Sequence, residues 1–418
     1  MPNESFKTSF GGILYSWDNR HGKAIILDGK PEAGWPEVLE QPAVLEGCPV
    51  AELEQFALVD ISTPCRVKLP ASLIEIDPEA FWPSHNGPQI TAFEADPLNP
   101  RYWSENGMLF CRAESTPYRD NNGARLVLAP PMAQTAQLPP YVTEIGPCAF
   151  AYIGAARVEL PAGLRLVGFH AFAHSALEEI EIPRSVKKLE PAVFEGSALR
   201  RASVDCALRS VPSALFKDCQ QLEQVVFAGS PRYVHHSAFF DCLALTNVYG
   251  LDNVIGIEPY AFLNCASLSC LDLSHLLKLG HAAFNLAGLK DVTLSGALKE
   301  VPWSAFSACY GLENLTLQEG ISHIEVGAFS CCHGLTQLHL PASLVSLGSG
   351  AFDCCTGLRH VYIPSHDLEF GSGVFNVAPP NSAQPLMKHP NLTLHGPAGS
   401  TTQQYAALAG YPFEVWEP

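Results

Sequence analysis

The fold is decided by a pattern that is clearest in residues 328–341, AFSCCHGLTQLHLP, and that returns at once in residues 351–364, AFDCCTGLRHVYIP. Each stretch holds an Ala-Phe pair, a Cys three residues after the Phe, and an L-x-x-L-x-L-P-like run. We call the Phe the anchor, because its residue number advances by 22 or 23 from each copy to the next. A fixed period of this length marks a chain built from repeated structural units. The regular anchors are Phe150, Phe172, Phe194, Phe216, Phe239, Phe262, Phe284, Phe306, Phe329, Phe352 and Phe375.

The period continues before the first regular anchor. The residue numbers of Phe81 and Phe150 differ by 69, three times 23, so the phase survives an interruption. We predict that Phe56 begins an earlier, less regular unit. Five residues before each anchor from Phe81 onward stands an apolar residue. With 47% apolar residues in the chain, chance alone would give this roughly once in ten thousand.

The L-x-x-L-x-L-P run predicts a short strand in every unit. Apolar and polar residues alternate with a period of two, which is typical of a strand, and the Pro ends the strand because it has no N–H to donate. One such coil buries about six apolar side chains at about 2 kcal/mol each. This gain does not offset the loss of conformational entropy, which costs about 1.5 kcal/mol for every residue that becomes ordered. Coils must therefore stack. The sequence predicts a repeat solenoid of some thirteen coils, a rod or an arc, with a parallel β-sheet of short strands and little helix.

Both ends of the chain carry patterns expected of solenoid caps, which cover open strand edges. Residues 13–17 and 23–27 flank a turn-forming stretch and predict a β-hairpin. Residues 400–403, STTQ, match a capping box and Gly410 a C-cap, so a short helix is expected between them. Residues 413–416 add a last apolar strand, and residues 378–391 are expected to form a loop before a strand at 392–394.

The repeat resembles the BspA-type leucine-rich repeats in its period, its A-F-x-x-C-x-x-L stretch and its I-P-x-S-V stretch at residues 182–186. Residues 99–102, 104–110 and 125–130 look like an element inserted in that family, where it forms a β-hairpin; here the loop between its strands, residues 112–124, is longer. The expected organisation is a hairpin cap and first coil at 1–60, repeats at 61–377 with a hairpin insertion at about 88–131, and a C-terminal loop, strand and capping helix at 378–418.

Composition narrows the classes of partner. The chain has 25 Lys and Arg against 42 Asp and Glu, a net charge of −17, which repels nucleic acids and anionic lipid surfaces. No apolar stretch is long enough to predict membrane insertion, and residues 1–12 do not resemble an export signal. As written, the chain is expected in the cytoplasm. The family resemblance implies a secreted or cell-surface protein if a signal was removed.

Six of the fourteen cysteines lie three residues after an anchor and should form a ladder of buried, reduced thiols. Parallel Cβ vectors in neighbouring coils hold the Cβ atoms farther apart than a disulfide prefers. Cys331 and Cys354 precede two of these cysteines and should point away from the core. With His333 they offer soft ligands for zinc or copper, but their spacing does not favour one metal site, so we expect no metal.

Motifs for catalysis and cofactors are lacking in the sequence. His170 and His174, like the pair His235-His236, are interpreted as solvated surface residues in coil turns. Residues 348–350 and 371–373, both GSG, are interpreted as turns and not as nucleophile elbows. No phosphate loop, zinc-protease motif or dinucleotide fingerprint occurs. We therefore expect no enzyme and no cofactor.

Binding is expected on the strand face, which we define as the surface formed by the polar residues that alternate with the buried strand positions. These residues form two rows. One runs through Asn247, Asn314, Gln337 and His360, and the other through Tyr249, Asp272, His339 and Tyr362. Amides, imidazoles and phenols suit recognition of peptides or sugars, although ordinary strand formers would also populate such a face. The candidate binding residues are Asn314, Gln337, His339, His360, Tyr362, Tyr249 and Asp272.

The function expected from this pattern is a non-enzymatic recognition scaffold, a monomer that binds a protein or a glycan along the strand face. The resemblance implies the same, because it points to bacterial surface adhesion proteins. The alternative is a structural spacer or a self-assembling module without a dedicated ligand site.

Overall fold

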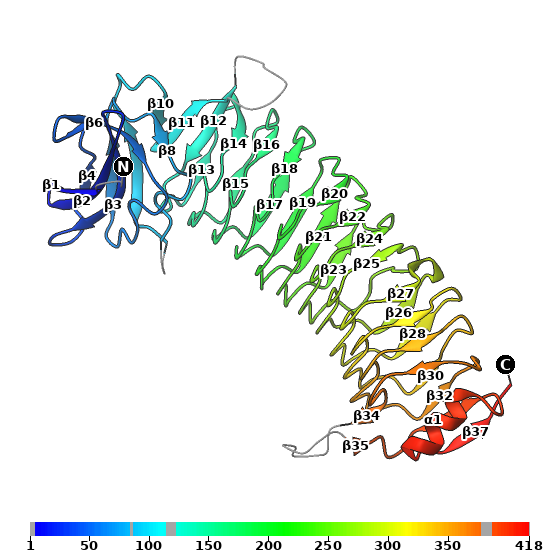
Figure 1. The fold of residues 1–418 in the computed structure, drawn as a ribbon. Coiled ribbons are helices and arrows are strands. Elements are labelled where there is room, and N and C mark those ends of the chain that lie inside the picture. Colours follow the sequence, from blue (N-terminus) through cyan, green and yellow to red (C-terminus); the bar gives the residue numbers. More distant parts are fainter. Residues whose placement is uncertain (1–4, 84–86, 114–122, 378–386, 418) are drawn as a thin grey trace. The chain divides into compact units, whose positions relative to one another are not determined.

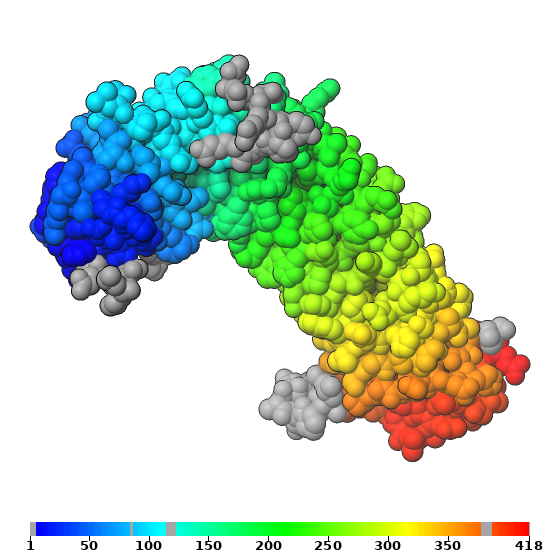
Figure 2. All heavy atoms as spheres, turned by 45° about the horizontal axis from the view of Figure 1, so that its top comes forward, coloured from blue at the N-terminus to red at the C-terminus, as the bar shows by residue number. Residues whose placement is uncertain are grey.

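The computed structural model describes residues 5–83, 87–113, 123–377 and 387–417. The chain forms two compact units, Met1–Leu199 and Arg200–Pro418. Both are built from short parallel strands on successive coils, as Figure 1 shows, so the predicted β-solenoid is confirmed. In the second unit the coils follow one another in chain order, green to orange in Figure 2.

The first unit begins with the predicted hairpin. Strands β2 (Ile13–Arg20) and β3 (Lys23–Pro31) pair antiparallel, and β1 (Ser5–Phe10), which was not expected, pairs antiparallel with β2. Strand β3 then pairs in parallel with β6 (Cys48–Leu53), which joins the hairpin to the coils. The neighbouring strands are β4 (Val38–Glu40), β5 (Val44–Leu45), β7 (Cys65–Leu69), β8 (Glu75–Ile76) and β9 (Ile90–Ala95).

The region of the expected insertion contains antiparallel strands. Strand β11 (Met108–Arg112) pairs antiparallel with β10 (Tyr102–Glu105) and with β12 (Ala124–Leu128). Strand β12 then pairs in parallel with β14 (Val142–Ile145), so the insertion returns the chain to the solenoid. Most of the long loop that the sequence singled out, residues 114–122, lies outside the described residues. The later strands of this unit are β13 (Ala136–Gln137), β15 (Val158–Glu159), β16 (Leu166–Val167), β17 (Glu179–Ile182) and β18 (Lys188–Leu189).

The anchor phenylalanines stack on one another inside the coils, as predicted. From Phe239 to Phe352 the ring centroids of neighbouring anchors lie 4.9–5.3 Å apart with interplanar angles of 3–8°. The anchor N–H donates to the carbonyl of the residue before the next anchor, as from Phe306 to Ala328 at 2.8 Å. Because one coil cannot cover both faces of its ring, each coil depends on its neighbours for its core.

Each regular coil of the second unit contributes one short strand to each of two series, and each series is divided into several parallel sheets. The first carries the predicted strands β19 (Arg201–Val204), β21 (Gln224–Phe227), β23 (Asn247–Tyr249), β26 (Asp291–Leu294), β28 (Asn314–Leu317), β30 (Gln337–His339) and β32 (His360–Tyr362). The second, which was not predicted, has two-residue strands at the apolar position before each anchor. They are β20 (Ser210–Val211), β22 (Tyr233–Val234), β24 (Gly256–Ile257), β25 (Lys278–Leu279), β27 (Glu300–Val301), β29 (His323–Ile324), β31 (Ser346–Leu347) and β33 (Glu369–Phe370). A short 3-10 helix, η1, covers Gly296–Leu298.

The prediction for Phe56 was wrong. Its side chain is 46% exposed, whereas Leu58 is fully buried. The N–H of Leu58 donates to Ala80 O at 2.8 Å, the bond that an anchor makes with the next coil. Leu58 precedes Phe81 by one full repeat, so the spacing identified the correct slot and the aromatic residue type did not.

The cysteine ladder is buried, and all fourteen cysteines are free thiols. From Cys242 onward each ladder thiol donates to the carbonyl of the anchor in the previous coil, as from Cys242 Sγ to Phe216 O at 3.0 Å and from Cys309 Sγ to Phe284 O at 3.1 Å. A thiol is small enough for this turn and still satisfies a buried carbonyl. Cys331 and Cys354 are partly exposed, as expected for their position.

The C-terminal cap follows the sequence closely. Helix α1 (Thr401–Ala409) begins after Ser400, whose hydroxyl accepts from Gln403 N, and ends at Gly410 with φ 74°. Strand β36 (Thr393–Gly396) pairs in parallel with β32 and with β37 (Phe413–Val415). The predicted loop is flanked by the antiparallel pair β34 (Asn376–Val377) and β35 (Met387–Lys388); residues 378–386 lie outside the described residues.

Candidate functional site

On β30 and β32 the strand face of the second unit has the two rows that the sequence predicted, because these strands pair without a register shift. Gln337 lies opposite His360, and His339 opposite Tyr362. The rows continue into β36, where Thr393 follows His360 and His395 follows Tyr362. Three of the candidate residues, His339, His360 and Tyr362, are therefore brought together.

These three residues belong to a group of rings that we call the ring cluster: His339, His360, Tyr362, His395 and Trp416. The ring of Tyr362 is stacked between His339, at 4.3 Å and 3°, and His395, at 4.4 Å and 15°. The indole of Trp416 meets the rings of His339 and Tyr362 edge to face, at 6.5 and 5.3 Å. Because the coil spacing is close to the preferred stacking distance of aromatic rings, equivalent positions on successive strands favour this arrangement.

Hydrogen bonds fix the imidazoles of the ring cluster. His360 Nδ1 and His395 Nε2 lie 3.0 Å apart, so one of them donates to the other. His395 Nδ1 lies 3.4 Å from a carboxylate oxygen of Glu414, which is on β37. Burial lowers the pKa of His395 below its ordinary value, against the opposing effect of Glu414. The neutral His395 is thus the form that the fold accommodates.

Asn314 and Gln337 lie on the same row as His360. Both are exposed, and Asn314 Nδ2 donates to Asp291 Oδ1 of the preceding strand at 2.6 Å. Such a ladder of polar side chains leaves hydrogen-bonding groups at regular intervals along the face. These two residues extend the polar surface beside the ring cluster.

Tyr249 and Asp272 lie apart from the other candidates, four and three coils of about 4.8 Å each from His339. They line a depression of about 390 Å³ where residues 268–273 form no strand, together with Asp252, Cys270 and Asp291. Asp272 accepts from the N–H and hydroxyl of Ser274, which lower the pKa of its carboxyl. This carboxylate is thus partly committed to its own turn.

Sequence reasoning missed His395, Glu414 and Trp416 of the site. The loop at 378–391 breaks the period, so His395 follows Tyr362 at a longer interval than one repeat. A usable signal was present, because the strand expected at 392–394 places the next alternate position at His395. Continuing the strand by one residue would have extended the row.

The possible soft-metal group at Cys331, Cys354 and His333 is not assembled for binding. His333 Nδ1 lies 2.9 Å from the backbone carbonyl of Cys354, and its ring stacks on Tyr310. The imidazole is thus committed to the backbone of the next coil. Ser349 and Ser372, at the centres of the two GSG stretches, hydrogen-bond to each other at 3.1 Å, as side chains of neighbouring turns do.

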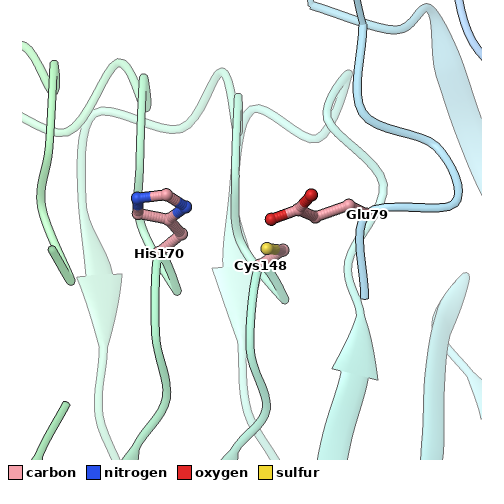
Figure 3. A group of neighbouring side chains, drawn as sticks. All are labelled: Glu79, Cys148 and His170. Carbon is pink, nitrogen blue, oxygen red and sulfur yellow. The ribbon is translucent and has the colours of Figure 1, made fainter. Parts of the chain in front are cut away.

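The interpretation of His170 as a solvated surface residue was wrong. Its side chain is 18% exposed, and it lies beside Glu79 and Cys148, with ligand atoms of the three residues within 4.8 Å of one another (Figure 3). His174 is exposed as expected, with its ring stacked on Tyr152. His235 is half-buried and paired with Glu258 at 2.8 Å, which the sequence did not indicate, and His236 is exposed.

Among the described residues, no helix is long and apolar enough to cross a membrane.

Comparison with known proteins gives a family and a fold. The model of the BspA type leucine rich repeat region matches residues 143–269 and 255–379, more than half of the chain. A leucine-rich repeat protein from Bacteroides ovatus is similar over 99% of this chain and 100% of that chain, with 18% identity and a TM-score of 0.59. At this identity the likeness shows the fold alone.

Two further solved structures are less similar. A leucine-rich repeat protein from Eubacterium ventriosum aligns over 60% of this chain and 64% of that chain, with 21% identity and a TM-score of 0.48. A leucine rich cell surface protein from Faecalibacterium prausnitzii aligns over 88% and 96%, with 16% identity and a TM-score of 0.41. No match was found among curated proteins.

Proposed function

The chain belongs to the family of BspA-type leucine-rich repeat proteins, and from this membership we propose that it is a non-enzymatic recognition protein that binds another protein through its strand face. Leucine-rich repeat proteins are generally scaffolds for protein interaction. Their coils place exposed side chains at regular intervals on a rigid surface. The strand face of the second unit, with the ring cluster at its C-terminal end, is the proposed contact surface.

The ring cluster is the observation that carries this proposal. Aromatic residues supply much of the binding energy at protein interfaces, because they bury a large area with few rotatable bonds. Here the stack of His339, Tyr362 and His395 and the bond between His360 and His395 hold the side chains before a partner arrives. A pre-ordered surface loses less conformational entropy on binding.

The orientation of the rings favours a protein over a glycan. Both faces of the Tyr362 ring are covered, by His339 and by His395. A sugar docks on an open aromatic face, whereas a covered ring offers its edge and its hydroxyl. Edges and hydroxyls suit hydrogen bonds to a polypeptide, and Asn314 and Gln337 add amides on the adjoining row.

The proposal is tested by capture of surface proteins from the source cells on the immobilised full chain. The double variant His339→Ala, Tyr362→Ala should capture at least about tenfold less partner, because aromatic hot spots cost about 2 kcal/mol or more each. The control is Trp303→Ala, Tyr310→Ala, a pair of exposed aromatic residues in turns outside the strand face, which should leave capture unchanged. Equal capture by both variants would remove the ring cluster from the site, and retention of a glycan without protein would change the partner class.

The same family membership leads us to propose a cell-surface or secreted location. Immunofluorescence on intact source cells tests this location, and signal that appears only after permeabilisation would contradict it.

Light scattering distinguishes a recognition protein from the alternative, a self-assembling spacer, because we expect a monomer across a range of protein concentrations. A concentration-dependent polymer would favour the spacer.

A further inference from the structure

Three residues of the first unit that share one repeat position bring a carboxylate, a thiol and an imidazole together. Glu79, Cys148 and His170 each stand two residues before an anchor. Their ligand atoms lie within 4.8 Å of one another, although Glu79 and Cys148 are separated in sequence by three repeat lengths. Figure 3 shows the Glu79 carboxylate directed toward the Cys148 thiol, with the His170 ring on the other side of the sulfur.

The repeat explains why these side chains meet. In each of the three turns, the N–H of the residue after the anchor donates to the carbonyl of this position at 3.0 Å, from Trp82 to Glu79, from Ala151 to Cys148 and from Ala173 to His170. The position is therefore structurally equivalent in the three turns. In the later coils it carries residues that are not metal ligands: Ala192, Ala214, Ser237, Tyr260, Ala282, Ser304, Gly327, Gly350 and Gly373.

The imidazole of His170 has the hydrogen-bonding pattern of a metal ligand. Its Nε2 lies 2.9 Å from Glu195 Oε2 on the next coil. Its other nitrogen, Nδ1, is buried and has no hydrogen-bond partner. Metal-ligating histidines usually donate one ring N–H to a carboxylate and bind the metal with the other nitrogen. Glu195 would thus hold His170 in the tautomer that leaves Nδ1 unprotonated.

The thiol of Cys148 is buried in an environment that resists its ionisation. Burial, together with the nearby carboxylates of Glu79 and Asp77, raises the pKa of Cys148 to about 12. A divalent cation reverses both effects, because it offsets the loss of hydration and turns the adjacent negative charge into an attraction. The Glu79 carboxylate is itself oriented by Gln55 Nε2, which donates to its Oε2 at 2.5 Å.

We propose that Glu79, Cys148 and His170 form a zinc site. A carboxylate oxygen of Glu79, Cys148 Sγ and His170 Nδ1 supply three ligands and a water molecule completes the tetrahedron, while the Cys148 proton passes to solvent. Tetrahedral Zn²⁺ sets such ligand atoms about 3.3–3.6 Å apart, so the present group, whose ligand atoms lie within 4.8 Å of one another, closes by at most about 1.5 Å. The thiolate and imidazole select zinc over magnesium and calcium.

Zinc at this position would fasten the chain across the inserted hairpin. Glu79 precedes the hairpin strands β10 to β12, and Cys148 and His170 follow them. A metal that binds the folded chain and not the unfolded one stabilises the fold by mass action. We therefore expect Zn²⁺ to raise the melting temperature of the first unit.

The test is calorimetric titration of the chelator-treated, reduced full chain with ZnSO₄. One Zn²⁺ should bind per chain, and Cys148→Ser and His170→Gln should each weaken binding at least about 100-fold. Glu195→Gln should weaken it about 10- to 100-fold through the orientation of His170. The matched controls are Cys309→Ser, a buried cysteine of the ladder, and His174→Gln, an exposed histidine of the neighbouring turn; both should bind as the parent chain does.

Substitution with Co²⁺ gives a second readout, because a thiolate ligand produces a charge-transfer absorption that Cys148→Ser should abolish. Circular dichroism checks that each variant is folded. If Cys148→Ser does not fold, His170→Gln provides the test of the site. A stoichiometry near zero in the parent chain would overturn the proposal. Binding in the Cys148 and His170 variants as strong as in the parent chain would also overturn it, because the ion would then lie elsewhere in the chain.

Discussion

The anchor slot makes a quantitative prediction for Phe306→Ala. The ring of Phe306 is fully buried between Phe284 and Phe329, each 5.3 Å away and within 6° of parallel. Removing a buried Phe costs about 3–5 kcal/mol, and the loss of two aromatic pairs adds about 0.5–1.5 kcal/mol each. We expect a loss of about 4–8 kcal/mol in the free energy of unfolding of the second unit.

Two further variants separate packing from ring stacking. Phe306→Leu retains most of the buried apolar area and should cost about 1–3 kcal/mol, mainly from the two lost stacks. Tyr310→Ala, in the same coil but 55% exposed, should cost less than about 1 kcal/mol.

The assay is urea unfolding followed by circular dichroism, with amide hydrogen exchange in the coils around residue 306, because repeat proteins do not always unfold in one step. Exchange should quicken first in the coils that neighbour the substitution. A cost below about 1 kcal/mol for Phe306→Ala, or equal costs for Phe306→Ala and Tyr310→Ala, would refute an interior stack of anchors.

Three further predictions concern the ladder, the caps and pH. Cys309→Val keeps the apolar volume but leaves Phe284 O without its thiol donor; we expect a loss of about 1–2 kcal/mol in urea unfolding, and an unchanged midpoint would contradict the role of the thiol. Ser400→Ala removes the N-cap of α1 and should lower the stability of the second unit by about 1 kcal/mol, whereas Ser400→Asp should retain it. Burial holds the pKa of His395 below its ordinary value of 6.5, so the unfolded chain binds a proton at this residue more readily than the folded chain does. The contribution of His395 to stability is therefore present above about pH 6.5 and is lost as the pH falls through the folded pKa. The melting temperature of the second unit should therefore decrease from pH 7.5 to 5.5, and His395→Gln should flatten that decrease; identical slopes for the two chains would contradict the burial argument.

The sequence predicts the repeated features of this fold well, because a solenoid imposes the same requirements on the chain in every coil. The anchor interval, the strand alternation and the capping box at Ser400 each correspond to one local physical requirement. The second series of strands was missed because a two-residue strand leaves a single apolar residue as its signal. Phe56 was wrongly assigned to the start of a unit because it is aromatic like the other anchors, whereas the repeat spacing places Leu58 in the anchor slot.

The candidate site was predictable only as far as the period extends. His339 and Tyr362 could be placed side by side because their strands are one coil apart and in register. His395 follows an irregular loop, and its alignment with Tyr362 depends on a pairing that spacing does not give. Glu79 and Cys148 were missed because their shared position appears only when the chain is aligned on the anchors across the insertion.

Backbone hydrogen exchange of the intact chain tests the stacking of the coils most directly, because each anchor N–H donates to the following coil. In the second unit these bonds measure 2.8–2.9 Å from Phe216 through Phe352. The account predicts slow exchange at the anchor amides, recurring once in every coil. Fast exchange at these amides, or protection that does not follow the anchor period, would contradict it.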